Sequence, residues 1–125
     1  MEQLNIYEAR EFTEFFLTKE GYLTPIHFSF PTDDKGEIVG KYINAYDLVM
    51  ALGYVYYMKA WEKIKTEQGI KVEYSFTITG GGAEDEIIFQ EDFLTYNQVV
   101  IMLSRINKIG IKERRRLLKF IKDSI

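Results

Sequence analysis

The spacing of apolar positions near the start of the chain predicts a helix over residues 5–19. Phe12, Phe15 and Phe16 recur at intervals of three and four, which places them on one side of an α-helix. Gly21 follows and is expected to end that helix. We expect the aromatic stripe to pack in the core.

Two later stretches alternate between apolar and polar side chains, which is the pattern of a half-buried strand. The first stretch, residues 23–30, leads through a run of turn-forming residues into residues 37–43, so a β-hairpin is predicted. The second, residues 70–79, is followed by a glycine-rich connection at 80–83 and by a returning strand over 84–90, which contains Ile87, Ile88 and Phe89. This order predicts a second hairpin with a long tip.

Between the two hairpins the sequence predicts two short helices. Asn44 is a favourable N-cap, and Asp47 places a carboxylate beside the free amides of the first turn. Gly53 suits the left-handed position that ends a helix. A second helix follows over residues 55–68, and its expected apolar side comprises Val55, Met58, Trp61 and Ile64. Two short helices joined by a glycine turn are typical of a helix-turn-helix.

The last part of the chain predicts two more helices. Thr95 and Gln98 have the spacing of a capping box at the start of the first. A break at residues 107–110 leads into the second, over residues 111–123, which is apolar on one face and basic on the other. The basic face comprises Lys112, Arg115, Arg116, Lys119 and Lys122.

These elements predict one α+β domain over residues 1–125. Its expected order is an N-terminal helix, a β-hairpin, a helix-turn-helix-like pair of helices, a second, wing-like β-hairpin and two C-terminal helices. A chain of 125 residues has the length of one ordinary domain, and its 46% hydrophobic residues are enough for a packed core.

The net charge of −3 hides a strong asymmetry along the chain. Residues 1–104 hold 8 Lys and Arg against 17 Asp and Glu, a net charge of −9, whereas residues 105–125 hold 8 against 2, a net charge of +6. An acidic body with a basic terminal helix indicates either a directed DNA contact or docking of that helix on an acidic protein surface. Charge alone leaves both alternatives open.

The sequence contains no pattern that carries a known catalytic chemistry. It has no cysteine, no nucleophile elbow, no dinucleotide glycine pattern and no histidine cluster, and its triple glycine is not followed by the Lys and Ser or Thr of a phosphate loop. His27 is the single histidine and falls on the polar side of a predicted strand. The acidic pairs Glu84/Glu86 and Glu91/Asp92 lack further metal ligands. We therefore expect no enzymatic activity, no cofactor and no metal.

The order Tyr42-Ile43-Asn44-Ala45, Asp47-Leu48, Gly53 and Trp61 resembles the core motif of the KilA-N and BRO-type DNA-binding domains of bacteriophages and large DNA viruses. Tyr46 stands where a threonine usually follows the Asn-Ala pair. The two-helix ending is similar to that of phage antirepressor and Rha-type domains. The resemblance implies DNA binding, with Tyr42, Asn44, Asp47, Gly53 and Trp61 as motif or structural residues. The acidic run at residues 84–86 departs from what a DNA-contacting wing requires.

The resemblance and the basic helix together predict a small phage- or mobile-element-type DNA-binding protein that regulates transcription without catalysis. The residues expected to contact nucleic acid are Lys59 and Lys63 in the second helix, and Lys108, Lys112, Arg115, Arg116, Lys119 and Lys122 near the C-terminus.

An alternative from another class is a small phage-borne protein that acts by protein–protein contact. It would inhibit a host defence or regulatory protein of basic surface through its acidic, nucleic-acid-mimicking body. A third alternative is a homo-oligomer held together by the aromatic faces. No apolar run approaches the roughly 20 residues of a membrane span, and the first residues do not form a signal peptide. We expect a cytoplasmic protein, in the host cytoplasm if it is phage-encoded.

Overall fold

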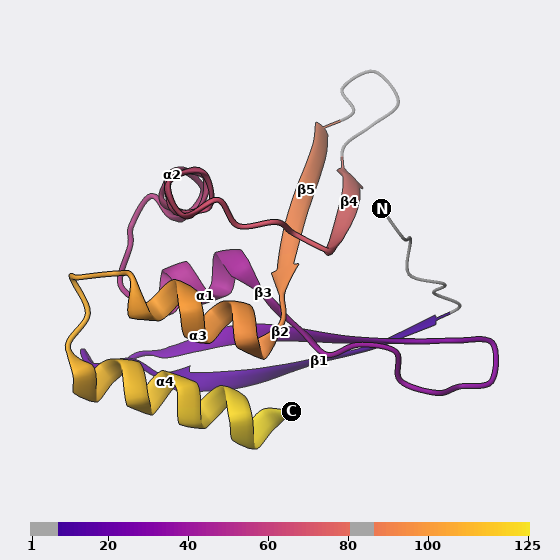
Figure 1. Cartoon of the computed structure of the whole chain (residues 1–125), viewed down its shortest axis with the longest axis horizontal. Helices are drawn as coiled ribbons and strands as arrows, with labels where there is room; N and C mark the ends of the chain where they lie inside the picture. Colours follow the sequence, from indigo (N-terminus) through magenta and orange to yellow (C-terminus); the bar gives the residue numbers. More distant parts are fainter. Residues whose placement is uncertain (1–7, 81–86) are drawn as a thin grey trace.

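The computed structural model describes residues 8–80 and 87–125 of the chain. Within these residues it shows an open, antiparallel five-stranded sheet and four helices, which confirms the predicted α+β class (Figure 1). The strands are β1 (Glu8–Leu17), β2 (Leu23–Thr32), β3 (Tyr42–Asn44), β4 (Tyr74–Gly80) and β5 (Ile87–Leu94). The helices are α1 (Ala45–Ala51), α2 (Tyr57–Gln68), α3 (Tyr96–Ser104) and α4 (Ile111–Ser124).

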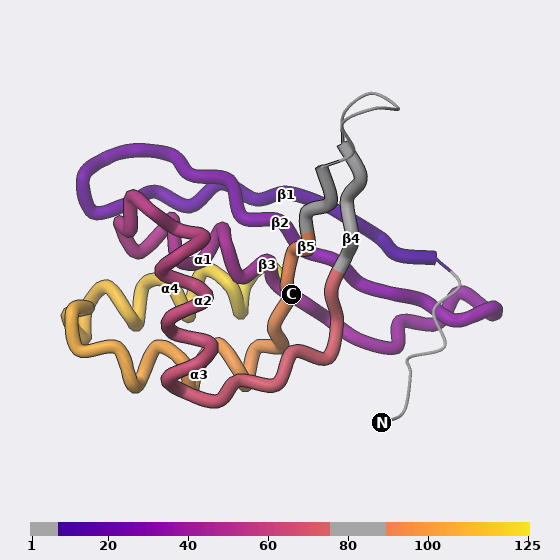
Figure 2. The backbone as a smooth tube through the Cα atoms, turned by 90° about the horizontal axis from the view of Figure 1, so that it is seen from above, coloured from indigo at the N-terminus to yellow at the C-terminus, as the bar shows by residue number. Residues whose placement is uncertain are grey.

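The sheet has the order β1-β2-β3-β5-β4, so the short strand β3 joins two longer hairpins. The helices lie together on one side of the β1–β2 hairpin (Figures 1 and 2). The β4–β5 hairpin projects beyond them (Figure 1). The main core lies between the helices and the facing side of the sheet. Its fully buried side chains are Trp61, Phe28, Ile26, Ile43, Leu48, Leu94, Met102, Leu103, Leu117, Ile121, Val49 and Val99.

The predicted N-terminal helix is wrong, because residues 8–17 form strand β1. Phe12 and Phe16 are four residues apart, a spacing that puts two side chains on the same side of either a helix or a strand. Both face the helices, and Phe16 is buried. Phe15 points to the other side of the sheet and is 60% exposed. Gly21, with a φ of 92°, lies in the β1–β2 turn instead of at a helix end.

The first predicted hairpin is correct in its pairing but not in its extent. Strand β3 pairs with β2 through only two positions, Phe28 with Ile43 and Ser29 with Tyr42. After Asn44 the chain turns away into α1, and Asp47 takes over as the partner of β2. Its carboxylate accepts a hydrogen bond from the backbone N–H of His27 at 2.8 Å. The edge of β2 is therefore closed by a side chain where β3 ends.

A small aromatic cluster lies on the sheet face turned away from the helices. Tyr42, Tyr74 and Phe93 are buried together, and the rings of Tyr42 and Tyr74 stack with centroids 4.7 Å apart. The hydroxyl of Ser29 is 2.8 Å from that of Tyr74. Burial raises the pKa of both tyrosines, and the negative charge of Glu73 adds to the rise at Tyr42.

The later elements occur in the predicted order, but three bounds differ. Strand β5 continues to Leu94 instead of ending at residue 90, and α2 begins at Tyr57 instead of at residue 55. Strand β4 begins at Tyr74, so residues 70–73 belong to the approach from α2. Most of the predicted hairpin tip, together with the acidic run at 84–86, lies outside the described residues. Thr95 and Gln98 form the predicted capping box, and α3 and α4 are separated where the break was expected. No helix among the described residues is both long and apolar enough to cross a bilayer.

Candidate nucleic-acid interface

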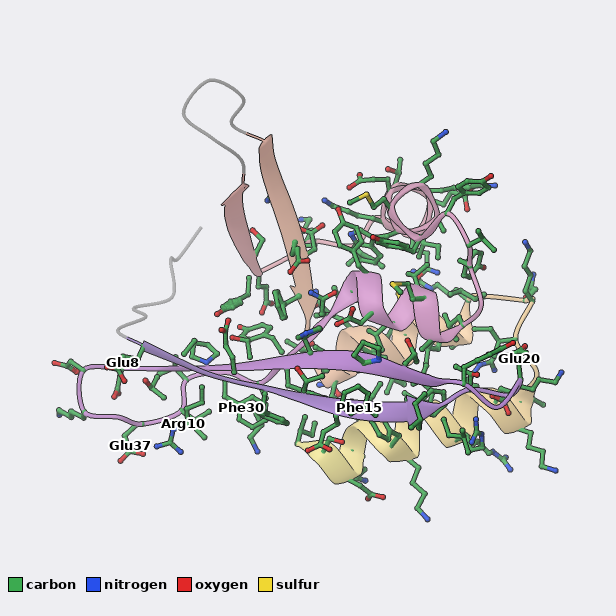
Figure 3. All side chains as sticks on the ribbon, turned by 180° about the vertical axis from the view of Figure 1, so that it is seen from behind. Glu8, Arg10, Phe15, Glu20, Phe30 and Glu37 are labelled. Carbon is green, nitrogen blue, oxygen red and sulfur yellow. The ribbon has the colours of Figure 1, made fainter. Side chains whose placement is uncertain are left out.

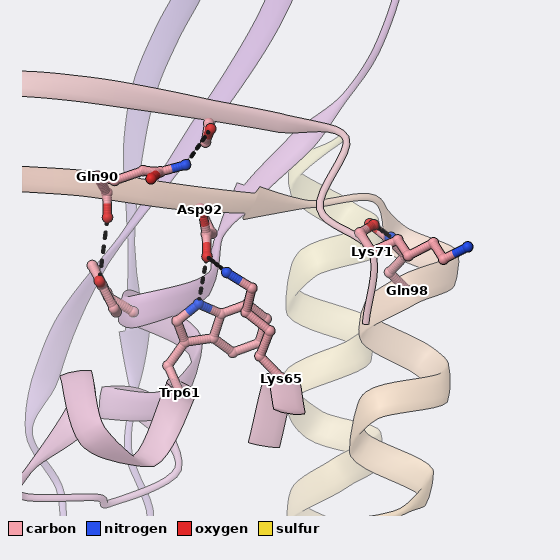
Figure 4. A network of polar contacts seen from close by, with 8 residues as sticks. Trp61, Lys65, Lys71, Gln90, Asp92 and Gln98 are labelled. Carbon is pink, nitrogen blue, oxygen red and sulfur yellow. Dashed lines mark hydrogen bonds and ion pairs between the residues drawn. The ribbon is translucent and has the colours of Figure 1, made fainter. Parts of the chain in front are cut away.

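Helix α2 is fixed to the sheet by one buried carboxylate on β5. Asp92 is 3% exposed and accepts hydrogen bonds from the Trp61 indole N–H at 2.8 Å and from the Lys65 ammonium at 3.0 Å (Figure 4). The hydrogen bond to Asp92 raises the pKa of Lys65. Because Trp61 and Lys65 lie one turn apart on α2, this contact fixes the rotation of the helix about its own axis.

The C-terminal end of α2 is also fixed. Gly69 has a φ of 64° and closes the helix with its N–H directed at the carbonyls of Lys65 and Thr66. The side-chain amide of Gln68 donates to the carbonyl of Met102 in α3 at 3.2 Å. Helix α2 is therefore held by both the sheet and α3, with a defined outer surface.

Lys59 and Lys63 lie on this outer surface, as the sequence predicted. Both are exposed and they are four residues apart, a rise of about 6 Å along a helix. Lys63 is 3.9 Å from Glu67, and the two side chains are 74% and 63% exposed. An ion pair this open to water contributes little, so it leaves Lys63 able to contact a ligand.

The connection between α3 and α4 brings two more cations opposite α2. Arg105 and Lys108 line a groove of about 760 Å³ together with Lys59 and Lys63. Glu67 is the single acidic residue among the groove-lining residues. Sequence reasoning identified Lys59, Lys63 and Lys108 but missed Arg105, which caps the end of α3. The basic composition of residues 105–125 was the available signal, but only the fold places Arg105 beside α2.

The groove also has an exposed apolar rim. Val55 and Tyr56 are 82% and 78% exposed, and the ammonium of Lys108 lies 5.4 Å from the ring centroid of Tyr54.

The expectation that Val55 and Met58 pack with Trp61 is wrong. Val55 precedes the first residue of α2, so helical spacing does not apply to it, and Met58 is 40% exposed beside the inward stripe.

The basic face of α4 forms a separate surface. Lys112, Arg115, Lys119 and Lys122 are exposed as predicted, and no residue of α4 lines the groove. Arg116 has a role within the fold. Its guanidinium lies 4.9 Å from the ring centroid of Phe16 and donates to the carbonyl of Leu17, so it ties α4 to β1. We refer to Lys59, Lys63, Arg105 and Lys108 as the groove cations, and to Lys112, Arg115, Lys119 and Lys122 as the α4 cations.

No protein-family model, curated protein or solved structure matches the chain.

The five motif residues act within the fold and do not line the groove. The Asn44 side chain accepts from the backbone N–H of Asp47 at 3.0 Å and donates to Glu91 at 3.2 Å. Gly53 has a φ of 94° after the end of α1. Trp61 and Tyr42 belong to the two buried clusters, and Asp47 closes the edge of β2. The motif residues and the groove cations are therefore different residues, and only α2 carries members of both sets.

Among the described residues, no group of three or more His, Cys, Asp or Glu side chains could hold a metal ion. Asp92 is occupied by Trp61 and Lys65, whereas Glu91 accepts from Asn44 on the other side of the strand. Glu84 and Glu86 lie outside the described residues. The exposed His27 side chain is 2.6 Å from Asp47, where it supports the β2–α1 contact.

Proposed function

We propose that this protein is a small DNA-binding regulatory protein, of the phage or mobile-element type, that binds without catalysis. The observation that supports this most strongly is the groove, in which four cations from two separate segments face one acidic residue. Each cation placed on a phosphate releases condensed counterions, which is the main source of affinity for DNA.

The order of the elements around the groove supports the same proposal. The short helix α1, a turn through Gly53 and the longer helix α2 have the order of a helix-turn-helix, and the β4–β5 hairpin follows as a wing would. In that arrangement α2 is the helix that enters the major groove. Lys59 and Lys63 would then face base edges and phosphates, while Arg105 and Lys108 would hold the adjacent backbone.

Tyr56 and Val55 extend this surface at the N-terminal end of α2. Both side chains are exposed beside the cations, where an apolar side chain can contact a thymine methyl and a tyrosine hydroxyl can reach a phosphate. The α4 cations would provide a second phosphate contact from a neighbouring face. Such a contact adds affinity but does not discriminate between DNA sequences.

The test is a titration of a fluorescently labelled random duplex with the protein at several salt concentrations, followed by anisotropy. We expect the logarithm of the association constant to fall linearly with the logarithm of salt, with a slope of about 0.9 per phosphate contact. Absence of binding at low salt would refute the proposal. Binding that does not depend on salt would exclude the groove cations as its source.

A second candidate function is inhibition of a basic host protein through the acidic body. The observation in its favour is the set of exposed carboxylates that β1 carries on its two faces, at Glu8, Glu11 and Glu14. Glu20 and Glu37 lie near the ends of the β1–β2 hairpin (Figure 3). Only Arg10 interrupts the negative charge of β1 itself. A protein that fails to bind DNA but is retained by a basic protein from its host, in a salt-sensitive manner, would favour this candidate.

A further inference from the structure

Strand β1 is an edge strand, and the direction of its peptide groups can be assigned. In an antiparallel pair the backbone groups of alternate residues point toward the partner. The turn bond from the Thr18 N–H to the Tyr22 carbonyl points toward β2, so the even-numbered residues of β1 bond to β2 and the odd-numbered ones point outward. The Leu17 carbonyl agrees with this, because it accepts from Arg116 outside the sheet.

The outward peptide groups of residues 9–15 have no partner within residues 8–80 and 87–125. Among the described residues, none donates to them or accepts from them. Nearby backbone groups do have side-chain partners. The His27 N–H donates to Asp47, and the Leu17 carbonyl accepts from Arg116. In Figure 2, β1 lies at the margin of the molecule, on the side of β2 opposite to β3. Helix α4 contacts β1 near its C-terminal end, at Phe16 and Leu17. A long open edge of this kind is a template for pairing with another strand.

We propose that the partner of this edge is β1 of a second copy of the chain, paired antiparallel about a two-fold axis at Phe12. The proposal does not depend on the proposed function. A two-fold pair that uses outward groups on both strands must place odd residues opposite odd residues. With Phe12 opposite itself, Glu11 pairs with Thr13 of the second copy, and Ala9 pairs with Phe15.

Charge complementarity selects this register over its neighbours. It places Arg10 opposite Glu14 of the second copy, twice in the dimer because of the symmetry. Neither residue makes an ion pair within the described part of its own chain, and both are exposed. Moving the axis to Glu11 or to Glu14 would set that glutamate against its own copy. Moving it to Thr13 would set Glu14 against Phe12, and moving it to Arg10 would oppose two arginines.

The apolar side chains fit the same register. Phe15 is 60% exposed and labelled on β1 in Figure 3, and it would lie beside Ala9, the smallest side chain of the strand. Phe12 is stacked on Phe28 with ring centroids 5.0 Å apart, so two such clusters would meet at the axis. The dimer would form one continuous sheet across both copies, which removes both β1 edges.

The test measures the mass of the protein in solution, for the wild type and for variants in which the charges at positions 10 and 14 are reversed singly and together. At high micromolar concentration, wild-type protein should have twice its monomer mass of 14.7 kDa by light scattering. Arg10→Glu or Glu14→Arg alone should raise the dimer dissociation constant about tenfold, because two attractive pairs become repulsive. The double variant Arg10→Glu/Glu14→Arg should restore it. A monomeric wild type, or a double variant as weak as either single one, would overturn the proposal.

A chain without cysteine allows a second measurement that fixes the register. A single Cys in place of Phe12 would face its own copy at the axis and should form an intermolecular disulfide under mild oxidation. Thr13→Cys is the matched control and should cross-link more slowly. Thr13→Pro removes an outward N–H and leaves the β1–β2 bonds in place, so it should abolish the dimer while the fold is retained by circular dichroism. Faster cross-linking through position 13, or a dimer that persists in Thr13→Pro, would contradict this register.

Discussion

The Trp61 indole donates its N–H to the Asp92 carboxylate across 2.8 Å, and both side chains are buried. This contact joins α2 to β5, the strand between β3 and β4. The outer surface of α2 supplies half of the groove cations. The geometry of the candidate interface therefore depends on this buried hydrogen bond.

Replacing Trp61 with Phe should therefore destabilise the protein. The variant keeps an aromatic ring but leaves Asp92 with only Lys65, and a lost partner of a buried polar group costs about 1–3 kcal/mol of unfolding free energy. Urea denaturation followed by circular dichroism measures the change. Tyr56→Phe is the control, because Tyr56 is exposed and the substitution should leave the midpoint unchanged. Equal midpoints for Trp61→Phe and wild type would show that the indole N–H contributes nothing to stability.

Replacing Asn44 with Ala should cost about 1–2 kcal/mol of unfolding free energy, because its side chain caps α1. The same change frees Glu91 from its contact with the Asn44 amide. Asn97→Ala is the matched control, since Asn97 is exposed in the first turn of α3. A denaturation midpoint for Asn44→Ala no lower than that of Asn97→Ala would contradict the cap.

Stability should decline at high pH. The hydrogen bond to Asp92 raises the pKa of Lys65 above its ordinary 10.5, and burial raises the pKa of Tyr42, Tyr46 and Tyr74 above 10.0. A group whose pKa is raised in the folded state stabilises the fold fully below its unfolded pKa, and this contribution is lost as pH rises through the folded value. Thermal unfolding should therefore shift to lower temperature above about pH 10.

An absorbance titration of the phenolate checks the tyrosine part of this prediction. Part of the tyrosine absorbance change in the native protein should occur above pH 10, later than in the urea-unfolded chain. Coincident titration curves for the folded and unfolded protein would be inconsistent with the raised pKa values.

The elements that could be predicted from the sequence are those whose ends are determined by a few neighbouring residues. Asn44, Gly53 and Gly69 mark helix ends through their own backbone and side-chain preferences, and Thr95 with Gln98 closes its capping box within four residues. Such signals need no knowledge of the rest of the chain. The basic face of α4 was predictable for the same reason.

The differences between prediction and structure at β1, Arg105 and Arg116 have non-local causes. Phe12 and Phe16 suit a helix and a strand equally well, and the pairing of β1 with β2 decides between them. Arg105 joins the groove only because α3 and α4 return the chain to α2. In the sequence, Arg116 belongs to the same basic face as its neighbours on α4. In the fold its guanidinium donates to the carbonyl of Leu17 in β1. Tertiary contacts of this kind leave no periodic pattern in the sequence.

The α4 cations should contribute affinity without sequence preference. Changing Arg115, Lys119 and Lys122 together to Gln removes three exposed charges and leaves Arg116 in its contact with Leu17. If each contacts a phosphate, the salt slope should flatten by roughly one unit per residue, and random and preferred duplexes should lose affinity alike. A loss confined to one duplex sequence would instead assign base contacts to α4.

The most direct test compares two charge-matched variants in DNA binding. The groove variant is Lys59→Gln/Lys63→Gln/Lys108→Gln, and the control is Lys19→Gln/Lys35→Gln/Lys71→Gln, which removes three exposed lysines that do not line the groove. Both variants carry the same net charge, so they differ only in where charge was lost. Fluorescence anisotropy with a labelled duplex should show a salt slope reduced by about two to three units for the groove variant and a nearly unchanged slope for the control. Equal slopes and affinities for the two variants would contradict the groove as the DNA-binding site.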